Sequence, residues 1–348
     1  MKVGKSLIDL ATEIERQAKS KQDYIADTRQ IAMLPDSGKL AISNVTQPMQ
    51  LRHHAHRQLA DRIGVPFKYY ERMLTQTPEL LAQNVNHWLQ AEPERRMVRT
   101  LDGDVRAFLS DRYARIDNYD VAQVVIPILR DNGMVVRSCE VTESRLYIKA
   151  TAPQITAKVE GSRRVGDVVE AGALVTNSEI GMGALSVKPF WMFLACLNGM
   201  VRDKVMHAAH IGRKQDAVDG LLSDSTKRAE DSVVLMKLRD VLKGAMDAAR
   251  FQREIERISE QTQQKLTGDP AKAVELLSNE LGLSDQEQGG VLRHLIEGGD
   301  LSRFGVTNAV TRLAEDVQSY DRATEIEALG GSIIDLSATQ WTRIAEAA

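Results

Sequence analysis

The stretch that decides the fold is DVVEAGALVTNSEIGMGALSVKPFWMFLACLNGMVRDKVMHAAHIGR, residues 167–213. Apolar residues alternate with other residues on both sides of a glycine-containing turn at 177–183, the pattern of two paired strands. From Pro189 onward apolar residues recur at helical spacing, and a proline suits the first turn of a helix because its missing N–H needs no partner there. The stretch therefore predicts strand, turn, strand and then a helix that begins at Pro189.

The chain before this stretch supplies more strands. Two β-prone runs within 95–116 are joined by Asp102-Gly103-Asp104, a strong hairpin signal. A helix is predicted over 119–132, with Pro127 inside it, and two strands over 134–141 and 145–151. This order predicts an α+β fold, in which a central antiparallel sheet carries helices on one face.

Three regions follow from these patterns. Residues 1–94 are expected to be an N-terminal helical region with a helical hairpin, 95–213 the α+β core, and 214–348 an all-helical C-terminal region. In the last region Ser284 and Glu287 have the spacing of a capping box, which marks the start of a helix.

Composition narrows the classes of function. The chain has 348 residues, 27% of them charged, and a net charge of −3, so a nucleic-acid surface would have to be a local patch. Two cysteines do not make a disulfide framework, which favours a reducing compartment. No apolar run is long enough to span a membrane. We therefore expect a cytoplasmic protein with no membrane partner.

The arginine-rich hairpin gives the main functional hypothesis. Arginine forks match phosphate oxygens and aromatic rings accept stacked bases, so arginines interleaved with aromatic residues favour single-stranded DNA. The alternative is a solvated sheet face whose arginines pair with Asp102, Asp104 and Asp111. The predicted nucleic-acid-binding residues, from this hairpin, the strands after it and the basic end of the helix predicted from Pro189, are Arg96, Arg99, Arg106, Phe108, Arg112, Tyr113, Arg115, Arg137, Arg145, Lys149, Lys188, Arg202 and Lys204.

Residues 51–74 read as two helices joined by a tight turn at Gly64. One interpretation is a DNA-binding helix-turn-helix with Lys68 and Arg72 on phosphates. The favoured one is a packed helical hairpin with aromatic residues in its core. His53 and His56 have a spacing that metal ligands can use, but no acidic or cysteine partner accompanies them, which favours solvated or hydrogen-bonded histidines.

No catalytic residue, metal or cofactor is predicted. The chain lacks the phosphate-loop, dinucleotide, zinc-protease and nucleophile-elbow motifs. Cys196 cannot share an ion with His207 or His210 on a continuous helix, because eleven residues span about 16 Å. Ser178 has no histidine placed to activate it, so we expect it to stabilise its turn.

Several segments in one order resemble the family called domain of unknown function 932 (DUF932), which consists of phage- and plasmid-encoded proteins. The matching segments are QLADRIGVPFKYYERM (58–73), RTLDGDVRAFLSDRYARIDNYDV (99–121), NSEIGMGALSV (177–187), ACLNG (195–199), TNAVTRLAEDVQSYDRATEIEALGG (307–331) and the closing Trp341. This resemblance implies a role in DNA metabolism or host conflict. The core is also similar to Rad52-type single-strand annealing proteins, which implies a cationic groove, stacking aromatic residues and assembly into oligomers.

The sequence thus predicts a non-catalytic, oligomeric protein of a phage or mobile element that binds and anneals single-stranded DNA in recombination. The alternative is a protein–protein module that binds or inhibits a host defence complex. A third hypothesis is an enzyme whose site centres on the turn at 177–179.

Overall fold

The computed structural model describes residues 1–113, 115–162, 167–202, 224–244 and 247–347. Its centre is a five-stranded antiparallel sheet in the order β10-β9-β8-β7-β6. The strands are β6 (Val135–Val141), β7 (Leu146–Lys158), β8 (Val168–Asn177), β9 (Ser186–Phe193) and β10 (Asn198–Val201). The predicted α+β class is confirmed, and the stretch that opened the sequence analysis supplies the three strands at one edge of the sheet.

The helix predicted from Pro189 is wrong. Pro189 lies within β9, opposite Ala173 of β8, and the chain returns through a short turn as β10. Alternate residues of β9 are buried on both faces, Phe190 on one and Trp191 on the other. A strand covered on both faces is apolar throughout, so its sequence cannot be told from that of a buried helix by periodicity.

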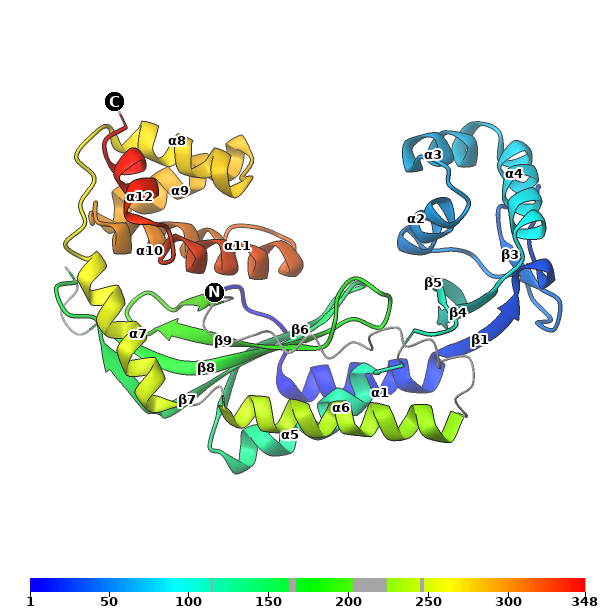
Figure 1. Cartoon of the computed structure of the whole chain (residues 1–348), viewed down its shortest axis with the longest axis horizontal. Coiled ribbons are helices and arrows are strands. Elements are labelled where there is room, and N and C mark those ends of the chain that lie inside the picture. Colours follow the sequence, from blue (N-terminus) through cyan, green and yellow to red (C-terminus); the bar gives the residue numbers. More distant parts are fainter. Residues whose placement is uncertain (114, 163–166, 203–223, 245–246, 348) are drawn as a thin grey trace.

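Helices cover both faces of the sheet, whereas the sequence predicted helices on one face. The first face carries four described helices. They are α1 (Leu7–Ser20), α5 (Asn118–Asp131), α6 (Asp224–Gly244) and α7 (Ala248–Gln261) (Figure 1). Leu10 of α1 and Val125 of α5 share a core with Ile148 and Val175 of the sheet. At the far end of the same face, Phe251 of α7 meets Trp191 edge-on, with ring centroids 5.8 Å apart. This face therefore holds the first part of the core.

The opposite face of the sheet meets the C-terminal region. Its helices are α8 (Pro270–Leu281), α9 (Asp285–Gly298), α10 (Arg303–Leu313), α11 (Tyr320–Ile333) and α12 (Ala338–Ala345). Tyr320 of α11 packs on Tyr147 and Phe190 of the sheet. Helices α8 to α12 form the C-terminal module, which has its own core around Trp341. The predicted capping box of Ser284 and Glu287 opens α9.

The region before residue 95 contains strands as well as the predicted helices. It contains β1 (Gln22–Asp27), the short helix η1 (Thr28–Gln30), β2 (Ile31–Met33) and β3 (Leu40–Ile42) as well as α1, α2 (His53–Arg62), α3 (Phe67–Gln76) and α4 (Pro78–Ala91). Strand β1 pairs with β4 (Arg95–Leu101), which pairs with β5 (Asp104–Ser110). The regions along the sequence are therefore not separate structural units.

The turn between β4 and β5 is the two-residue hairpin that the sequence predicted. Asp102 and Gly103 both have positive φ, 56° and 84°, as a tight turn between twisted strands requires. Helices α2, α3 and α4, called the N-terminal module here, stand beyond this small sheet. Figure 1 shows the N-terminal and C-terminal modules at opposite ends of the central sheet.

The packing of β8 against β7 leaves no room for a side chain at Gly172. A Cβ there would collide with the carbonyl oxygen of Ala150 on the neighbouring strand. We expect Gly172→Ala to lower the free energy of unfolding by about 1–3 kcal/mol, as overpacked cores do. Urea denaturation followed by circular dichroism measures this.

Gly289 within α9 is the matched control, because a Cβ there meets no atom within 4 Å. Gly289→Ala should leave stability unchanged or raise it by up to about 1 kcal/mol, the helix propensity of alanine over glycine. Equal losses in both variants would contradict the packing argument.

Candidate functional site

Arg99, one of the predicted DNA-binding residues, is fully buried where the small sheet meets the central one. Its Nε donates to Asp23 Oδ1 of β1 at 2.8 Å and its Nη2 to Asp117 Oδ1 at 2.6 Å, just before α5. Its Nη1 donates to the carbonyl oxygen of Glu179 in the β8–β9 turn at 3.0 Å. One guanidinium therefore connects three segments that lie far apart in the sequence.

Arg106 of β5 extends this network. Its Nη2 lies 2.5 Å from Glu179 Oε2, and the other oxygen of Glu179 accepts the backbone N–H of Asn118 at 2.6 Å. That acceptor satisfies an N–H in the first turn of α5, where helices lack internal partners. We call Asp23, Arg99, Arg106, Asp117 and Glu179 the charged junction.

The charged junction determines the ionisation of Asp117. Burial favours the neutral carboxyl, but the positive charges of Arg99 and Lys21 outweigh it and hold the pKa of Asp117 below its ordinary value. Asp117 is therefore a carboxylate at neutral pH. This charge makes the burial of Arg99 possible, because an unpaired guanidinium would be strongly disfavoured inside the protein.

Other predicted DNA-binding cations also have carboxylate partners inside the chain. Lys149 Nζ lies 2.5 Å from Glu327 Oε2 of α11, and neither side chain is exposed. Arg202 Nη2 lies 3.0 Å from Asp335 and 3.2 Å from Glu254. Two further pairs are Arg137 with Glu170 at 2.6 Å and Arg96 with Glu94 at 2.5 Å.

The predicted stacking residues are also engaged. Phe108 is 2% exposed, with the Arg96 guanidinium 5.8 Å from its ring centroid, and Tyr113 donates its hydroxyl to the carbonyl oxygen of Ser178 at 2.8 Å. A base can stack only on a ring whose face is accessible. Phe108 offers no such face.

The remaining predicted DNA-binding cations differ in their surroundings. Arg145 donates to the carbonyl oxygen of Met182, and Lys188 of β9 is half-buried. Arg112 and Arg115 are exposed and make no side-chain ion pair with a described residue, while Lys204 lies outside the described residues. The expectation that these cations share one open surface of the sheet is therefore corrected, because most of them hold elements together.

Three further surface cations, without a carboxylate partner among the described residues, lie on the N-terminal module. Within the described chain, Arg57 of α2 and Lys68 and Arg72 of α3 are exposed and make no ion pair. Arg57 lies over the ring of Phe67, 5.1 Å from its centroid, which places it beside the start of α3. The four-residue spacing of Lys68 and Arg72 in the sequence indicates that both lie on one face of this helix.

The histidines of α2 are not arranged as metal ligands. His56 is buried and its Nδ1 lies 2.9 Å from the hydroxyl of Tyr70, while His53 packs its ring edge-on against Phe67 at 5.2 Å. Burial lowers the pKa of His56 to about 4, so it is neutral at physiological pH. No cluster of three metal-ligating side chains occurs among the residues that the structure describes.

The turn at 177–183 has a structural role. Ser178 Oγ donates to the carbonyl oxygen of Ser144 at 2.8 Å and accepts the backbone N–H of Met182 at 3.0 Å. Asn177 donates to Asn118 Oδ1 at 2.9 Å. A serine whose hydroxyl closes its own turn is not positioned as a nucleophile.

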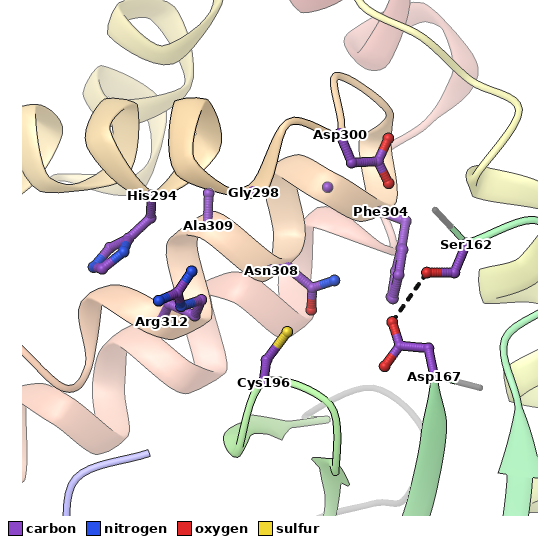
Figure 2. A pocket seen from close by; sticks show the side chains of 11 residues that line it. Ser162, Asp167, Cys196, His294, Gly298, Asp300, Phe304, Asn308, Ala309 and Arg312 are labelled. Carbon is purple, nitrogen blue, oxygen red and sulfur yellow. Dashed lines mark hydrogen bonds between the residues drawn. The ribbon is translucent and has the colours of Figure 1, made fainter. Parts of the chain in front are cut away.

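A small cavity of about 30 Å³ lies between the β9–β10 turn and the C-terminal module (Figure 2). Cys196, His294, Asn308 and Arg312 line it, and His294 Nε2 lies 2.8 Å from Asp316. A cavity of this volume holds a water molecule but no substrate. His207 and His210, which the sequence analysis considered as partners of Cys196 in holding an ion, lie outside the described residues.

No protein-family model, curated protein or solved structure matches this chain. The resemblance to the DUF932 family and to Rad52-type proteins therefore stays a prediction. Among the described helices, none has the length and apolar character needed to cross a membrane.

The pairing of Lys149 with Glu327 predicts how stability responds to substitution. We expect Lys149→Met alone to lower the free energy of unfolding by about 3–5 kcal/mol, because it leaves Glu327 buried and unpaired. The double substitution Lys149→Met with Glu327→Leu should recover most of this loss. Urea denaturation of both variants and of Glu327→Gln measures the coupling.

Arg130→Met is the matched control for this series, since Arg130 is exposed and pairs only with the adjacent Asp131. Its stability should stay within about 0.5 kcal/mol of wild type. A single Lys149→Met variant as stable as this control would show that the buried pair does not form.

The charged junction predicts a pH dependence. Removing Arg99 as Arg99→Gln leaves Asp117 buried without its main counter-charge, which raises its pKa. We expect the variant to lose about 3–5 kcal/mol at pH 7, and the deficit to shrink below about pH 5 as Asp117 takes up a proton.

The direction of this pH dependence follows from the wild type, in which the pKa of Asp117 is lowered by folding. A lowered carboxyl pKa stabilises the folded state above the unfolded pKa of about 3.9, and this stabilisation is lost as the pH falls through the folded pKa. Urea denaturation at pH 7, 6, 5 and 4 measures the difference. A deficit that is independent of pH would contradict this role of Asp117.

Proposed function

We propose that this chain is a non-catalytic binding protein that docks on a partner protein through its N-terminal module. The observation that carries the proposal is the contrast between two surfaces. Most of the cations predicted for the sheet are engaged in internal ion pairs, whereas α3 and α4 expose large apolar side chains: Tyr69 is 51% exposed, Leu80 42% and Trp88 39%.

These residue types support a protein interface. Tyrosine, tryptophan and arginine are the residues that most often dominate binding energy at protein interfaces. Leu80 and Trp88 lie two turns apart on α4, the ring of His87 packs edge-on against Trp88 at 5.0 Å, and Arg72 is exposed on α3. An exposed tryptophan beside an arginine-bearing helix is the chemistry of such a contact.

The module that presents these side chains is well packed. Tyr70 and Met73 of α3 and Leu81 and Val85 of α4 are buried in one core. A surface built on packed helices loses little conformational entropy on binding, which favours affinity. The resemblance to mobile-element proteins makes a host complex the first partner to test.

A second candidate function is the binding of single-stranded DNA by the same module. Arg57, Lys68 and Arg72 have no carboxylate partner among the described residues, and Tyr69 between them has an accessible ring. This keeps the predicted role in annealing or recombination but moves it from the sheet to α2 and α3. Cations that are free to meet phosphates are the specific support for it.

A photo-crosslinking amino acid in place of Trp88 tests the first candidate. In nuclease-treated lysate of the natural host we expect a protein adduct, because Trp88 would lie inside the interface. The same probe in place of Thr342, exposed on α12 at the far end of the molecule, is the control and should give none. An adduct whose mass is twice that of the chain would identify the predicted homo-oligomer.

Substituting Tyr69→Ala in the probe-carrying chain should reduce the yield of adduct at least about tenfold, as loss of an interface hot spot does. Identical labelling from positions 88 and 342 would contradict the docking surface.

Fluorescence polarisation with a labelled single-stranded DNA oligonucleotide tests the second candidate function. Affinity should fall with salt with a log–log slope of about −0.7 per phosphate contact, and Lys68→Gln and Arg72→Gln should each remove about one contact. Arg130→Gln, far from the module, should leave the slope unchanged. Absence of binding at low salt would exclude this candidate.

A further inference from the structure

A cavity of about 170 Å³ lies beside the charged junction and belongs to neither candidate function. It is bounded by α1, by the β4–β5 turn, by the β6–β7 turn at 142–145 and by the β8–β9 turn at 179–180. Its volume is sufficient for several water molecules or one small organic molecule. Four chain segments thus meet around a space that the fold leaves open.

Four guanidinium groups line this cavity, and two of them are neutralised. Arg16 lies 2.8 Å from Glu13 and 2.7 Å from Asp102. Arg106 lies 2.5 Å from Glu179. The carboxylates on this part of the wall are therefore engaged already.

The other two guanidiniums, those of Arg52 and Arg145, have no carboxylate at hydrogen-bond distance in the described part of the chain. Arg52 has two carboxylates at longer range, Asp104 at 3.5 Å and Asp102 at 4.0 Å, and it donates one long hydrogen bond of 3.3 Å to the carbonyl oxygen of Leu101. Arg145 donates to the carbonyl oxygen of Met182 and has no carboxylate within 4 Å among the described residues. Two cations from separate segments thus keep donors available beside the same space.

The buried wall of the cavity also carries an unused donor. Arg106 is only 6% exposed, and its Nε has no acceptor. A buried donor without an acceptor is disfavoured by about 1–3 kcal/mol unless a ligand or water satisfies it. The fourth carboxylate of the lining, Glu143, is exposed and forms no ion pair with the described residues.

We propose that this cavity binds a small anion whose phosphate or carboxylate oxygens bridge Arg52 and Arg145. The planar forks of two arginines recognise such groups with paired, charge-assisted hydrogen bonds. Arg52 precedes α2 and Arg145 lies in the turn just before β7, so the anion joins the N-terminal module to the central sheet. Binding therefore stabilises the folded chain independently of the docking surface on α3 and α4.

Thermal unfolding of the full chain with inorganic phosphate, with pyrophosphate and with malonate tests the site. At about 100 times the dissociation constant we expect the Tm to rise by about 5 °C with at least one of them. The three probes distinguish between binding of a single phosphate, of a linked diphosphate as in nucleotides, and of a dicarboxylate. No shift and no saturable heat with any probe in isothermal titration calorimetry would overturn the proposal.

Variants locate the effect in the cavity. Arg52→Gln and Arg145→Gln should each weaken binding at least about tenfold, whereas Arg112→Gln, which removes an exposed cation outside the lining, should not change it. Equal affinity in Arg145→Gln and wild type would overturn the assignment.

Glu143→Gln provides a test of opposite sign that does not depend on an arginine variant folding. It removes a negative charge near the anion without breaking an ion pair, so affinity should rise about two- to fivefold. A weaker or unchanged affinity in this variant would contradict an anion at this position.

Discussion

The rest of the structure depends on the burial of one charge, that of Arg99. A guanidinium without access to water must be paired, and Arg99 is paired with Asp23 and Asp117 and with the carbonyl oxygen of Glu179. These partners belong to β1, to the chain before α5 and to the β8–β9 turn. Asp23 belongs to the same small sheet as Arg99, so it is Asp117 and the carbonyl oxygen of Glu179 that fix the orientation of the small sheet on the central one.

The same principle fixes the other end of the molecule. Lys149 of β7 meets Glu327 of α11, and Arg202 meets Asp335 in the turn after that helix. The ring centroid of Trp191 lies 5.3 Å from the Arg202 guanidinium. Buried ion pairs contribute little net stability compared with apolar packing, but loss of one partner is strongly destabilising. Charge in this chain specifies the arrangement of its parts more than it presents a surface.

Most buried charges are thus paired inside the protein, whereas a few surfaces carry side chains that are not. The exposed aromatic residues and unpaired cations of α2, α3 and α4 lie on one packed module, which suits recognition of a macromolecule. The cavity beside the charged junction is different in kind, because its small volume and its guanidiniums suit an anion. A partner on the module and an anion in the cavity would bind different parts of the fold.

Local features were determined by the sequence alone: the Asp102-Gly103 hairpin, α5 with Pro127 inside it, the helical hairpin and the capping box of α9. Each is set by residues within a few positions of one another. Pro189 was assigned to a helix because β9 is buried on both faces, and which faces are covered depends on α7 and α11. The partners of Arg99 and Lys149 could not be predicted from the sequence either, because Asp23, Asp117 and Glu327 come close to them only in the folded chain. Tertiary structure alone decided which cations meet solvent, because that depends on distances between segments that the order of residues does not contain.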